Sequence, residues 1–407
     1  LPSVAFISAF LNNTPVVVIF APIIKHWAKS VNLPATKFLI PLSYVTILGG
    51  ICTLIGTSTN LVVHGMILEA GFEGFSMFEL GKVGIFIAIA GIIYIFLFSK
   101  RLLPDARPDT AVPDEEVEEG EKLHRVEAVL GARFPGINKK LKDFNFQRHY
   151  GAEVKEIKTR NGQRFVSNLE EVVLHEGDTL VVMADDTFIP TWGESSVFVL
   201  LTNGNEPDTT GKKKRWFALL LLVLMIVGAT VGELPVTKEM FPDIKLDMFF
   251  FVSITTIIMA WTNLFPARKY TKYISWDILI TIACAFAISK AMVNSGVADS
   301  VAKFIIGLSD DYGPHVLLAM VFIITNLFTE LITNNAAAAL AFPLALSISA
   351  QLGVSPTPFF VVICMAASAS FSTPIGYQTN LIVQGIGNYK FTDFVRIGLP
   401  LNIITFL

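Results

Sequence analysis

The sequence predicts a polytopic α-helical membrane protein made of two inverted repeats, with two re-entrant hairpins, two broken helices and one small α+β cytoplasmic domain. Three observations predict it. Of the 407 residues, 53% are hydrophobic and only 16% are charged, whereas soluble domains are about 25% charged. The charges are also concentrated, because 39 of the 65 lie between Lys100 and Arg215. Finally, one polar motif occurs twice, 320 residues apart.

The apolar stretches have the length of membrane helices, which need about 20 residues. Uninterrupted candidates are 81–99, 216–232, 247–264 and 274–295, and a last one opens near 395. Four other stretches contain polar clusters. Two of these predict hairpins with polar tips: 1–11, Asn12-Asn13-Thr14, 15–28; and 313–332, Thr333-Asn334-Asn335, 336–350. Two predict broken helices: 36–52, the break 53–60, 61–70; and 355–372, the break 373–380, 381–388.

The two breaks form an internal repeat. Thr53-Leu-Ile-Gly56-Thr57-Ser-Thr-Asn60 matches Thr373-Pro-Ile-Gly376-Tyr-Gln-Thr379-Asn380 at Thr, Ile, Gly, Thr and Asn. The tips keep the same spacing, since Asn13 precedes its break by 40 residues and Asn334 precedes its break by 39. Candidate residues at the breaks are Thr53, Thr57, Asn60, Gly376, Thr379 and Asn380.

The distribution of Lys and Arg predicts the orientation, because cytoplasmic loops carry an excess of both. Basic residues flank the base of the first hairpin and the ends of the insert, at Lys25, Lys100 and the run 212–215. The first hairpin therefore enters from the cytoplasm. Five predicted crossings separate the two hairpins, so the second enters from outside. We expect a multi-pass protein of the plasma or inner cell membrane, with residues 100–215 cytoplasmic.

The insert divides the chain into six parts. We expect a first transport half at 1–99, an acidic linker at 100–124, a cytoplasmic domain at 125–190, a second linker at 191–215, scaffold helices at 216–312 and a second transport half at 313–407. The domain is predicted to contain strands at 125–131, 152–158 and 179–183 and a helix at 137–146. Since the chain starts and stops inside apolar segments, we also expect terminal helices to be missing.

The breaks and tips carry the chemistry. Backbone at membrane depth is tolerated only where it is buried in protein or lines a cavity, and broken helices at a repeat interface are typical of the binding site of a secondary transporter. Helix N-termini offer N–H donors to an anion, while free carbonyls and Asn, Thr and Ser oxygens suit an alkali cation. Each residue alone could be a helix cap, but the repeated four-part set favours a transport site.

Other functional classes have little support. A net charge of −3 and the lack of a basic stripe argue against nucleic acid. The three cysteines lie singly, so we expect no transition-metal site. The sequence contains no cofactor motif and no catalytic set that would predict an enzyme.

Glu330, deep in an apolar arm, either ties the hairpin to a neighbouring helix or assists a cation. His64 is expected to be a satisfied helix histidine rather than a proton relay.

At these tips and breaks the sequence resembles the divalent anion:sodium symporter family, part of the ion-transporter superfamily. The resemblance covers 1–99 and 216–407. That family has Ser-Asn-Thr at each tip and Thr-Pro-x-Gly-x-x-x-Asn at each break. Here the leading Ser is replaced at both tips, the Thr is replaced at one, and Leu54 replaces the proline of the first break.

The resemblance implies a sodium-coupled site without a cofactor. It places one Na⁺ near Ser8, Asn12, Asn13 and Gly56, a second near Thr329, Asn334, Ser372, Thr373 and Pro374, and a substrate near Asn13, Thr14, Asn334 and Asn335. It also implies a homodimer.

Residues 125–190 resemble the TrkA C-terminal domain of potassium-transport regulators, through Gly136-Ile-Asn-Lys-Lys-Leu141 and Glu176-Gly-Asp-Thr-Leu180. Such domains imply either passive dimerisation or sensing of a small cytosolic ligand.

The leading hypothesis is a sodium-coupled secondary transporter of small divalent anions, sulfate first and dicarboxylate second, working by elevator-type alternating access. Its partners would be the anion and the lipid bilayer. A proton- or sodium-driven exchanger, with Glu330 central to turnover, is one alternative. A channel gated by a ligand of the cytoplasmic domain is another.

Overall fold

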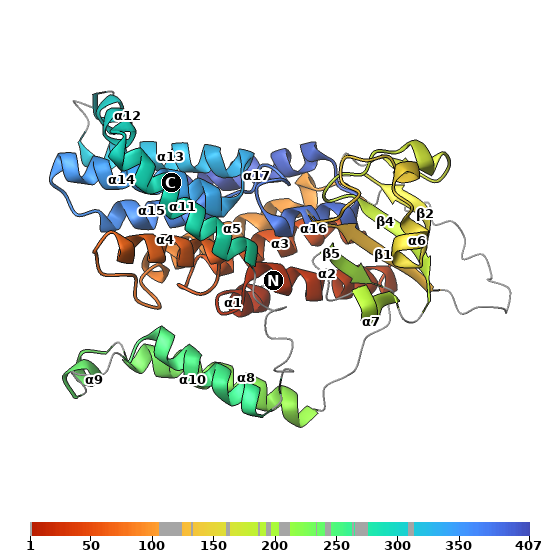
Figure 1. Ribbon diagram of the computed structural model, residues 1–407, viewed down its shortest axis with the longest axis horizontal. Helices are drawn as coiled ribbons and strands as arrows, with labels where there is room; N and C mark the ends of the chain where they lie inside the picture. Colours follow the sequence, from red (N-terminus) through yellow and green to blue (C-terminus); the bar gives the residue numbers. More distant parts are fainter. Residues whose placement is uncertain are drawn as a thin grey trace.

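The computed structural model consists of helices from both ends of the chain, packed together, and one β-sheet that lies at one end of this helical body (Figure 1). It describes residues 2–105, 124–131, 133–159, 163–185, 188–192, 197–202, 212–232, 234–240, 246–262, 264, 276–307 and 313–407. Most of the predicted acidic linker, and all of 203–211 in the second linker, lie outside the described residues.

The first half folds around one completely buried helix. Its helices are α1 (Pro2–Ser8), α2 (Asn13–Ser30), α3 (Leu39–Gly50), α4 (Ser58–Glu69) and α5 (Gly81–Leu102). Every residue of α3 is buried, and α1, α2 and α5 all pack against it. A helix that is apolar on all sides belongs in a core, and α3 holds the first break in place.

The second half repeats this order of helices. It contains α13 (Pro314–Leu331), α14 (Asn334–Leu352), α15 (Thr357–Ser368), α16 (Gln378–Gly387) and α17 (Phe391–Phe406). The two breaks occur as predicted, but they begin and end a few residues earlier. Helices resume at Ser58 and Gln378 because Thr57 and Tyr377 have extended backbone and act as N-caps.

The middle helices contain two short elements that the sequence analysis missed, at 235–240 and 297–307. They are α8 (Lys212–Gly232), α9 (Pro235–Met240), α10 (Met248–Trp261), α11 (Trp276–Asn294) and α12 (Val297–Gly307). After α11 the chain turns at Gly296, which has φ +72°, and α12 continues at 71° to it. Ala298, Ala302 and Ile305 form the buried face of α12, a helical spacing beyond residue 295, where the last predicted scaffold helix ended.

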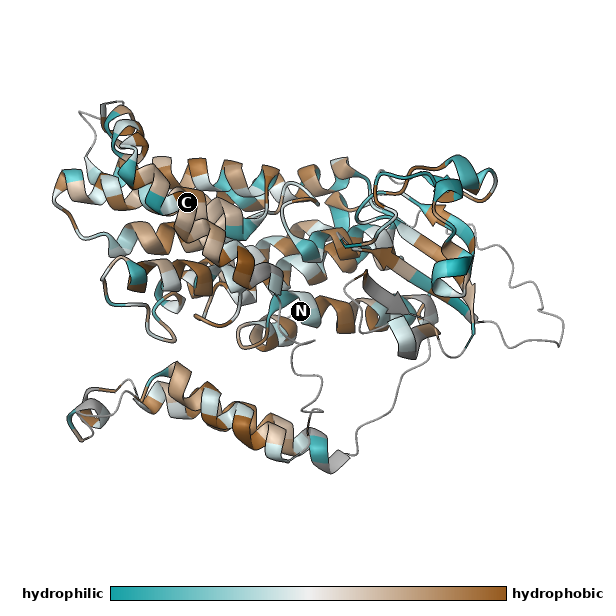
Figure 2. Ribbon diagram, viewed as in Figure 1, coloured by the Kyte–Doolittle hydropathy of each residue, from teal (hydrophilic) through white to brown (hydrophobic). Residues whose placement is uncertain are grey.

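Three described helices, α5, α13 and α14, are each long and apolar enough to cross a membrane, and the bent pair of α11 and α12 forms a fourth candidate. Hydrophobic residues run along the helices, and hydrophilic residues gather around the sheet (Figure 2). The prediction of an apolar helical protein of several spans is confirmed. Because α13 and α14 could each cross alone, the re-entrant placement of the hairpins stays a prediction.

The two halves share one hydrophobic core. A single cluster of buried residues runs from Val4 to Leu401 and includes side chains from both repeats. Across the repeats, α16 packs against α2 and α3, while α14 and α15 pack against α4. This interlocking brings both breaks and both hairpin tips to one place.

The insert forms a five-stranded antiparallel sheet of order β3-β2-β4-β1-β5. The strands are β1 (His124–Leu130), β2 (Glu153–Lys158), β3 (Arg164–Phe165), β4 (Thr179–Ala184) and β5 (Phe198–Thr202). The three predicted strands are present. β5 stands where we expected a linker, because it pairs with β1 and closes that edge.

The helix predicted at 137–146 is wrong. Those residues form turns and a short 3₁₀ segment, Leu141–Asp143, and the short helices of the insert are α6 (Phe146–Tyr150) and α7 (Phe188–Trp192). Asn138 has φ +62°, which breaks a helix at that point. The apolar residues of this segment instead join an aromatic cluster around Phe134.

Candidate functional site

The first break is held open by side chains. The Asn60 amide nitrogen donates to the carbonyl oxygens of Gly50 (3.4 Å) and Thr53 (2.9 Å). The Thr53 hydroxyl in turn donates to the Ala9 carbonyl, next to the first tip. These bonds pair carbonyl groups that the interrupted helix leaves free, as buried backbone requires.

The second break uses the same bonds at matching positions. The Asn380 amide donates to the carbonyl oxygens of Ser370 (2.9 Å) and Thr373 (3.2 Å), with the spacings of ten and seven residues seen in the first break. The Thr373 hydroxyl donates to the Glu330 carbonyl (2.9 Å), next to the second tip. The repeat read from the sequence is therefore also a repeat of hydrogen bonds.

Each break needs a glycine because another part of the backbone touches it. A Cβ atom on Gly56 would lie 2.4 Å from the Gly50 carbonyl oxygen, and one on Gly376 would lie 2.2 Å from the Thr329 carbonyl oxygen. No side chain fits at either position without moving the backbone.

The two tips meet at the hydroxyl of Tyr377, which belongs to the second break and is buried. The Asn13 amide nitrogen donates to this oxygen at 2.5 Å, and Thr57 Oγ1 lies 2.8 Å from it. The Asn334 side chain lies close to the same oxygen. Ser8 donates to the Asn13 amide oxygen at 2.7 Å, so that side chain is fixed from both ends.

Each tip also contacts the helix that follows the break of the other repeat. Thr14 donates to Gln378 Oε1 at 3.3 Å. Asn335 Oδ1 accepts from Ser58 at 3.3 Å and from Thr59 at 3.1 Å. These crossed contacts build a site from both halves, and neither half could form it alone.

Four helices begin at this site: α2 at Asn13, α14 at Asn334, α4 at Ser58 and α16 at Gln378. The first residues of a helix have N–H groups without helical partners, and the helix dipole is positive at this end. The crossed hydrogen bonds hold all four ends together. Their combined field favours an anion, with neutral groups as its donors.

The predicted sodium-site residues fall into two groups. In the first repeat, Ser8 and Asn13 are buried and in contact, Gly56 packs against Gly50, and Asn12 is exposed at the tip. In the second repeat, the residues lie along the second break and its neighbouring arm: Thr329, Ser372, Thr373 and Pro374. Thr329 Oγ1 donates to the Ala367 carbonyl oxygen at 2.6 Å, while the Asn334 amide oxygen accepts from the Asn335 N–H at 3.1 Å.

The surroundings of Glu330 favour one of its two predicted roles. Its Oε1 accepts from the Ser372 N–H (2.8 Å) and from the Asn402 amide (2.7 Å), and its Oε2 accepts from Ser370 (3.4 Å). These donors lie on the second break and on α17. The carboxylate therefore ties three elements together, as a structural tie does.

The surroundings of His64 agree with the structural expectation. Its Nδ1 accepts a hydrogen bond from the Phe75 N–H at 3.0 Å. Within the described part of the chain, no group of three His, Cys, Asp or Glu side chains could hold a metal ion.

The sequence analysis missed several residues of the site, among them Tyr377 and Ser43. Tyr377 was part of the quoted motif but was not named as a candidate, although it is where the repeat departs from Thr57. Ser43 on α3 lies 2.8 Å from Thr379 Oγ1 and 2.7 Å from Asn380 Oδ1, across the repeats. Ser43 is a single serine in an apolar helix, and no sequence pattern indicates that it contacts the second break.

Comparison with known proteins matches residues 3–348 and 244–407 to the citrate transporter family. An uncharacterized transporter of Synechocystis is 30% identical, over 98% of this chain and 78% of that protein. Sodium/sulfate cotransporter 2 of Chlamydomonas reinhardtii is 31% identical, over 69% of this chain and 31% of that protein. Human solute carrier family 13 member 4 is 25% identical, over 37% of this chain and 23% of that protein.

Proposed function

The chain belongs to the citrate transporter family, and from this premise we propose that it is a sodium-coupled secondary transporter of small divalent anions, with sulfate as the first candidate. The Chlamydomonas relative is named a sodium/sulfate cotransporter, which supports both the ion and the anion. Dicarboxylate is the second candidate substrate.

The observation that carries this proposal is the meeting of four helix N-termini around the Tyr377 hydroxyl. The side chains offered to an anion there are neutral: the amides of Asn13 and Asn334, the hydroxyl of Thr14 and the amide of Asn335. A lysine or arginine would hold an anion tightly in both orientations of the carrier. Neutral donors release it more readily, so its affinity can depend on cations bound beside it.

Sodium is proposed to bind on the two sides of this anion site. The first set is Ser8, Asn12, Asn13 and Gly56, and the second is Thr329, Asn334, Ser372, Thr373 and Pro374. Oxygen-rich sets of this kind suit a hard alkali cation. An ion that occupied the first set would compete with the bond between Ser8 and Asn13, and so would reorient the amide that we assign to the substrate.

The proposed cycle is alternating access of the elevator type. Residues 1–99 and 313–407 would move against a scaffold at 216–312, in a homodimer in the cell membrane, with residues 100–215 in the cytoplasm. The insert would act as a dimerisation module or as a sensor of a cytosolic ligand, as a TrkA C-terminal domain would. The exchanger alternative loses support because three neutral donors hold the Glu330 carboxylate.

Binding of radiolabelled sulfate to the purified protein tests the site. We expect saturable binding in sodium buffer and little binding in choline buffer, with succinate as a weaker competitor. Sulfate binding that is equal in both buffers would refute sodium coupling. Displacement of the label by lower concentrations of succinate than of unlabelled sulfate would make dicarboxylate the preferred substrate.

A further inference from the structure

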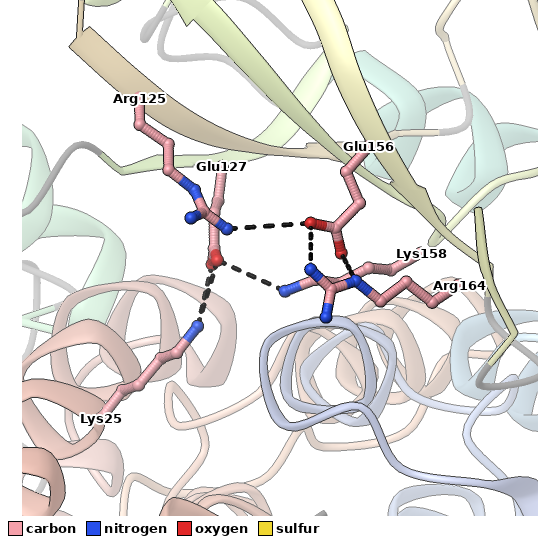
Figure 3. A network of polar contacts seen from close by, with 6 residues as sticks. All are labelled: Lys25, Arg125, Glu127, Glu156, Lys158 and Arg164. Carbon is pink, nitrogen blue, oxygen red and sulfur yellow. Dashed lines mark hydrogen bonds and ion pairs between the residues drawn. The ribbon is translucent and has the colours of Figure 1, made fainter. Parts of the chain in front are cut away.

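The inserted domain lies directly against two helices of the site. The Lys25 ammonium, on α2, contacts the Glu127 carboxylate of β1 at 3.0 and 3.2 Å. Glu127 also faces Lys158 of β2 at 3.5 Å. Figure 3 shows Lys25 reaching up from the helices to the underside of the sheet.

The contact is mostly shielded from water. The side chains of Glu127 and Lys158 are 17% and 6% exposed. Burial alone would raise the pKa of the Glu127 carboxyl, but Lys25 and Lys158 lower it to about 2. The Glu127 carboxylate is therefore ionised near neutral pH. The stabilisation that the ionised carboxylate gives to the folded protein is lost only as the pH falls from about 4.3, the pKa of a Glu in an unfolded chain, towards 2. A second set, in which Arg125 and Arg164 pair with Glu156, lies beside it.

A close packing contact joins the domain to α16. A Cβ atom on Gly385 would lie 2.6 Å from Thr179 Oγ1 and 3.5 Å from the Gly177 carbonyl oxygen. A Cβ atom on Gly177 would in turn lie 3.2 Å from the Leu381 side chain. The turn before β4 thus rests on the helix, and glycine at 385 allows this approach.

Both contacted helices begin at the anion site. Lys25 is twelve residues from the start of α2, about 18 Å along its axis, and Gly385 is seven residues from the start of α16, about 10 Å. Helices transmit displacement along their length. We propose that the sheet is docked on α2 and α16, moves with them as one body, and so sets the rate at which the site changes orientation.

The repeat offers a matched set of variants. Gly385→Ala places a methyl group against Thr179 and should loosen the docked sheet. Thr179→Ala removes the opposing oxygen, for which the described residues offer no hydrogen-bond partner, so the double variant should restore docking. Gly65→Ala is the control, since Gly65 occupies the equivalent position 320 residues earlier. Among the described residues outside its own helix, its Cβ would approach Phe286 alone, at 3.6 Å.

Two readouts separate this proposal from the transport function on which it rests. Docking is measured by hydrogen–deuterium exchange of peptides covering 124–131 and 176–184, which needs no transport. Turnover is measured as sodium-driven sulfate uptake into proteoliposomes. We expect Gly385→Ala to raise exchange and to lower the maximal rate about fivefold or more, with KM unchanged, and we expect the double variant to recover both.

Raised exchange with an unchanged maximal rate would overturn the proposal, because the domain would then be passive. Unchanged exchange in Gly385→Ala would also overturn it. If this variant does not fold, Glu127→Gln serves instead, because it leaves Lys25 and Lys158 without their carboxylate. Failure of the wild-type protein to transport sulfate would refute the proposed function, and the exchange data would still decide the docking.

Discussion

A single phenolic oxygen, that of Tyr377, accepts a hydrogen bond from Asn13 of the first tip and lies 2.8 Å from Thr57 Oγ1 of the first break. Asn334 of the second tip lies close to it. In the first repeat the equivalent residue is Thr57, whose side chain is too short to span the site. The two repeats therefore differ at this position, because the Tyr377 side chain is long enough to reach residues of both halves. At the scale of single residues, Tyr377 and the two tip asparagines define the site.

Replacing Tyr377 with Phe removes this oxygen and leaves the Asn13 amide without its acceptor. A buried donor without a partner costs about 1–3 kcal/mol, so we expect the affinity for sulfate to fall about tenfold. The measurement is equilibrium binding in sodium buffer. Tyr389→Phe is the matched control, since that hydroxyl is also buried but bonds to the Thr36 carbonyl oxygen, away from the tips. Equal losses in both variants would count against a special role for Tyr377.

Asn13→Ala and Asn334→Ala should each abolish uptake while leaving the protein folded. Each substitution removes an amide that we assign to both substrate and cation. Uptake in vesicles measures the loss, and size-exclusion elution checks the fold. Wild-type uptake by either variant would disprove the site assignment.

Glu330→Gln separates a structural tie from a coupling acid. Since the carboxylate accepts hydrogen bonds from three neutral groups, an amide can replace only some of them. We expect a loss of about 1–3 kcal/mol in stability and an unchanged dependence of uptake on sodium. Uptake that no longer responds to sodium, in a stable variant, would support the exchanger hypothesis.

At the scale of elements, the breaks were the most predictable part of the structure. Their polar motifs repeat, and the structure pairs Asn60 and Asn380 with carbonyls at the same spacings. Their boundaries were less predictable, because the cap positions of Thr57 and Tyr377 depend on contacts across the repeats. α12 was missed since a single glycine turn, at Gly296, separates it from α11.

The two break glycines should not tolerate a methyl group. In Gly56→Ala and Gly376→Ala the new carbon would lie within 2.4 Å of backbone or side-chain atoms, and overpacking of this kind costs about 1–3 kcal/mol or more. Thermal unfolding in detergent should show lower midpoints for both. Gly307→Ala is the control, since its Cβ would meet no described residue within 4 Å. A midpoint equal to that of the control would contradict the close backbone approach.

At the scale of the whole molecule, composition and charge distribution predicted an apolar helical body and a polar insert. The repeat predicted which residues are equivalent, but not which ones touch. The contact between Thr14 and Gln378, and that between Ser58 and Asn335, depend on how the halves interlock. The same limit applies to the docked sheet, where Gly385 and Thr179 meet although each is unremarkable in its own segment.

Because the two halves interlock to form the site, sodium-driven accumulation of a divalent anion would require the whole molecule. Its most direct test is a time course of radiolabelled sulfate uptake into proteoliposomes with an inward sodium gradient. We predict a transient rise of internal sulfate above its equilibrium level, which disappears when choline replaces sodium or when the gradient is dissipated. Uptake that only approaches equilibrium, at the same rate with and without the gradient, would contradict the account.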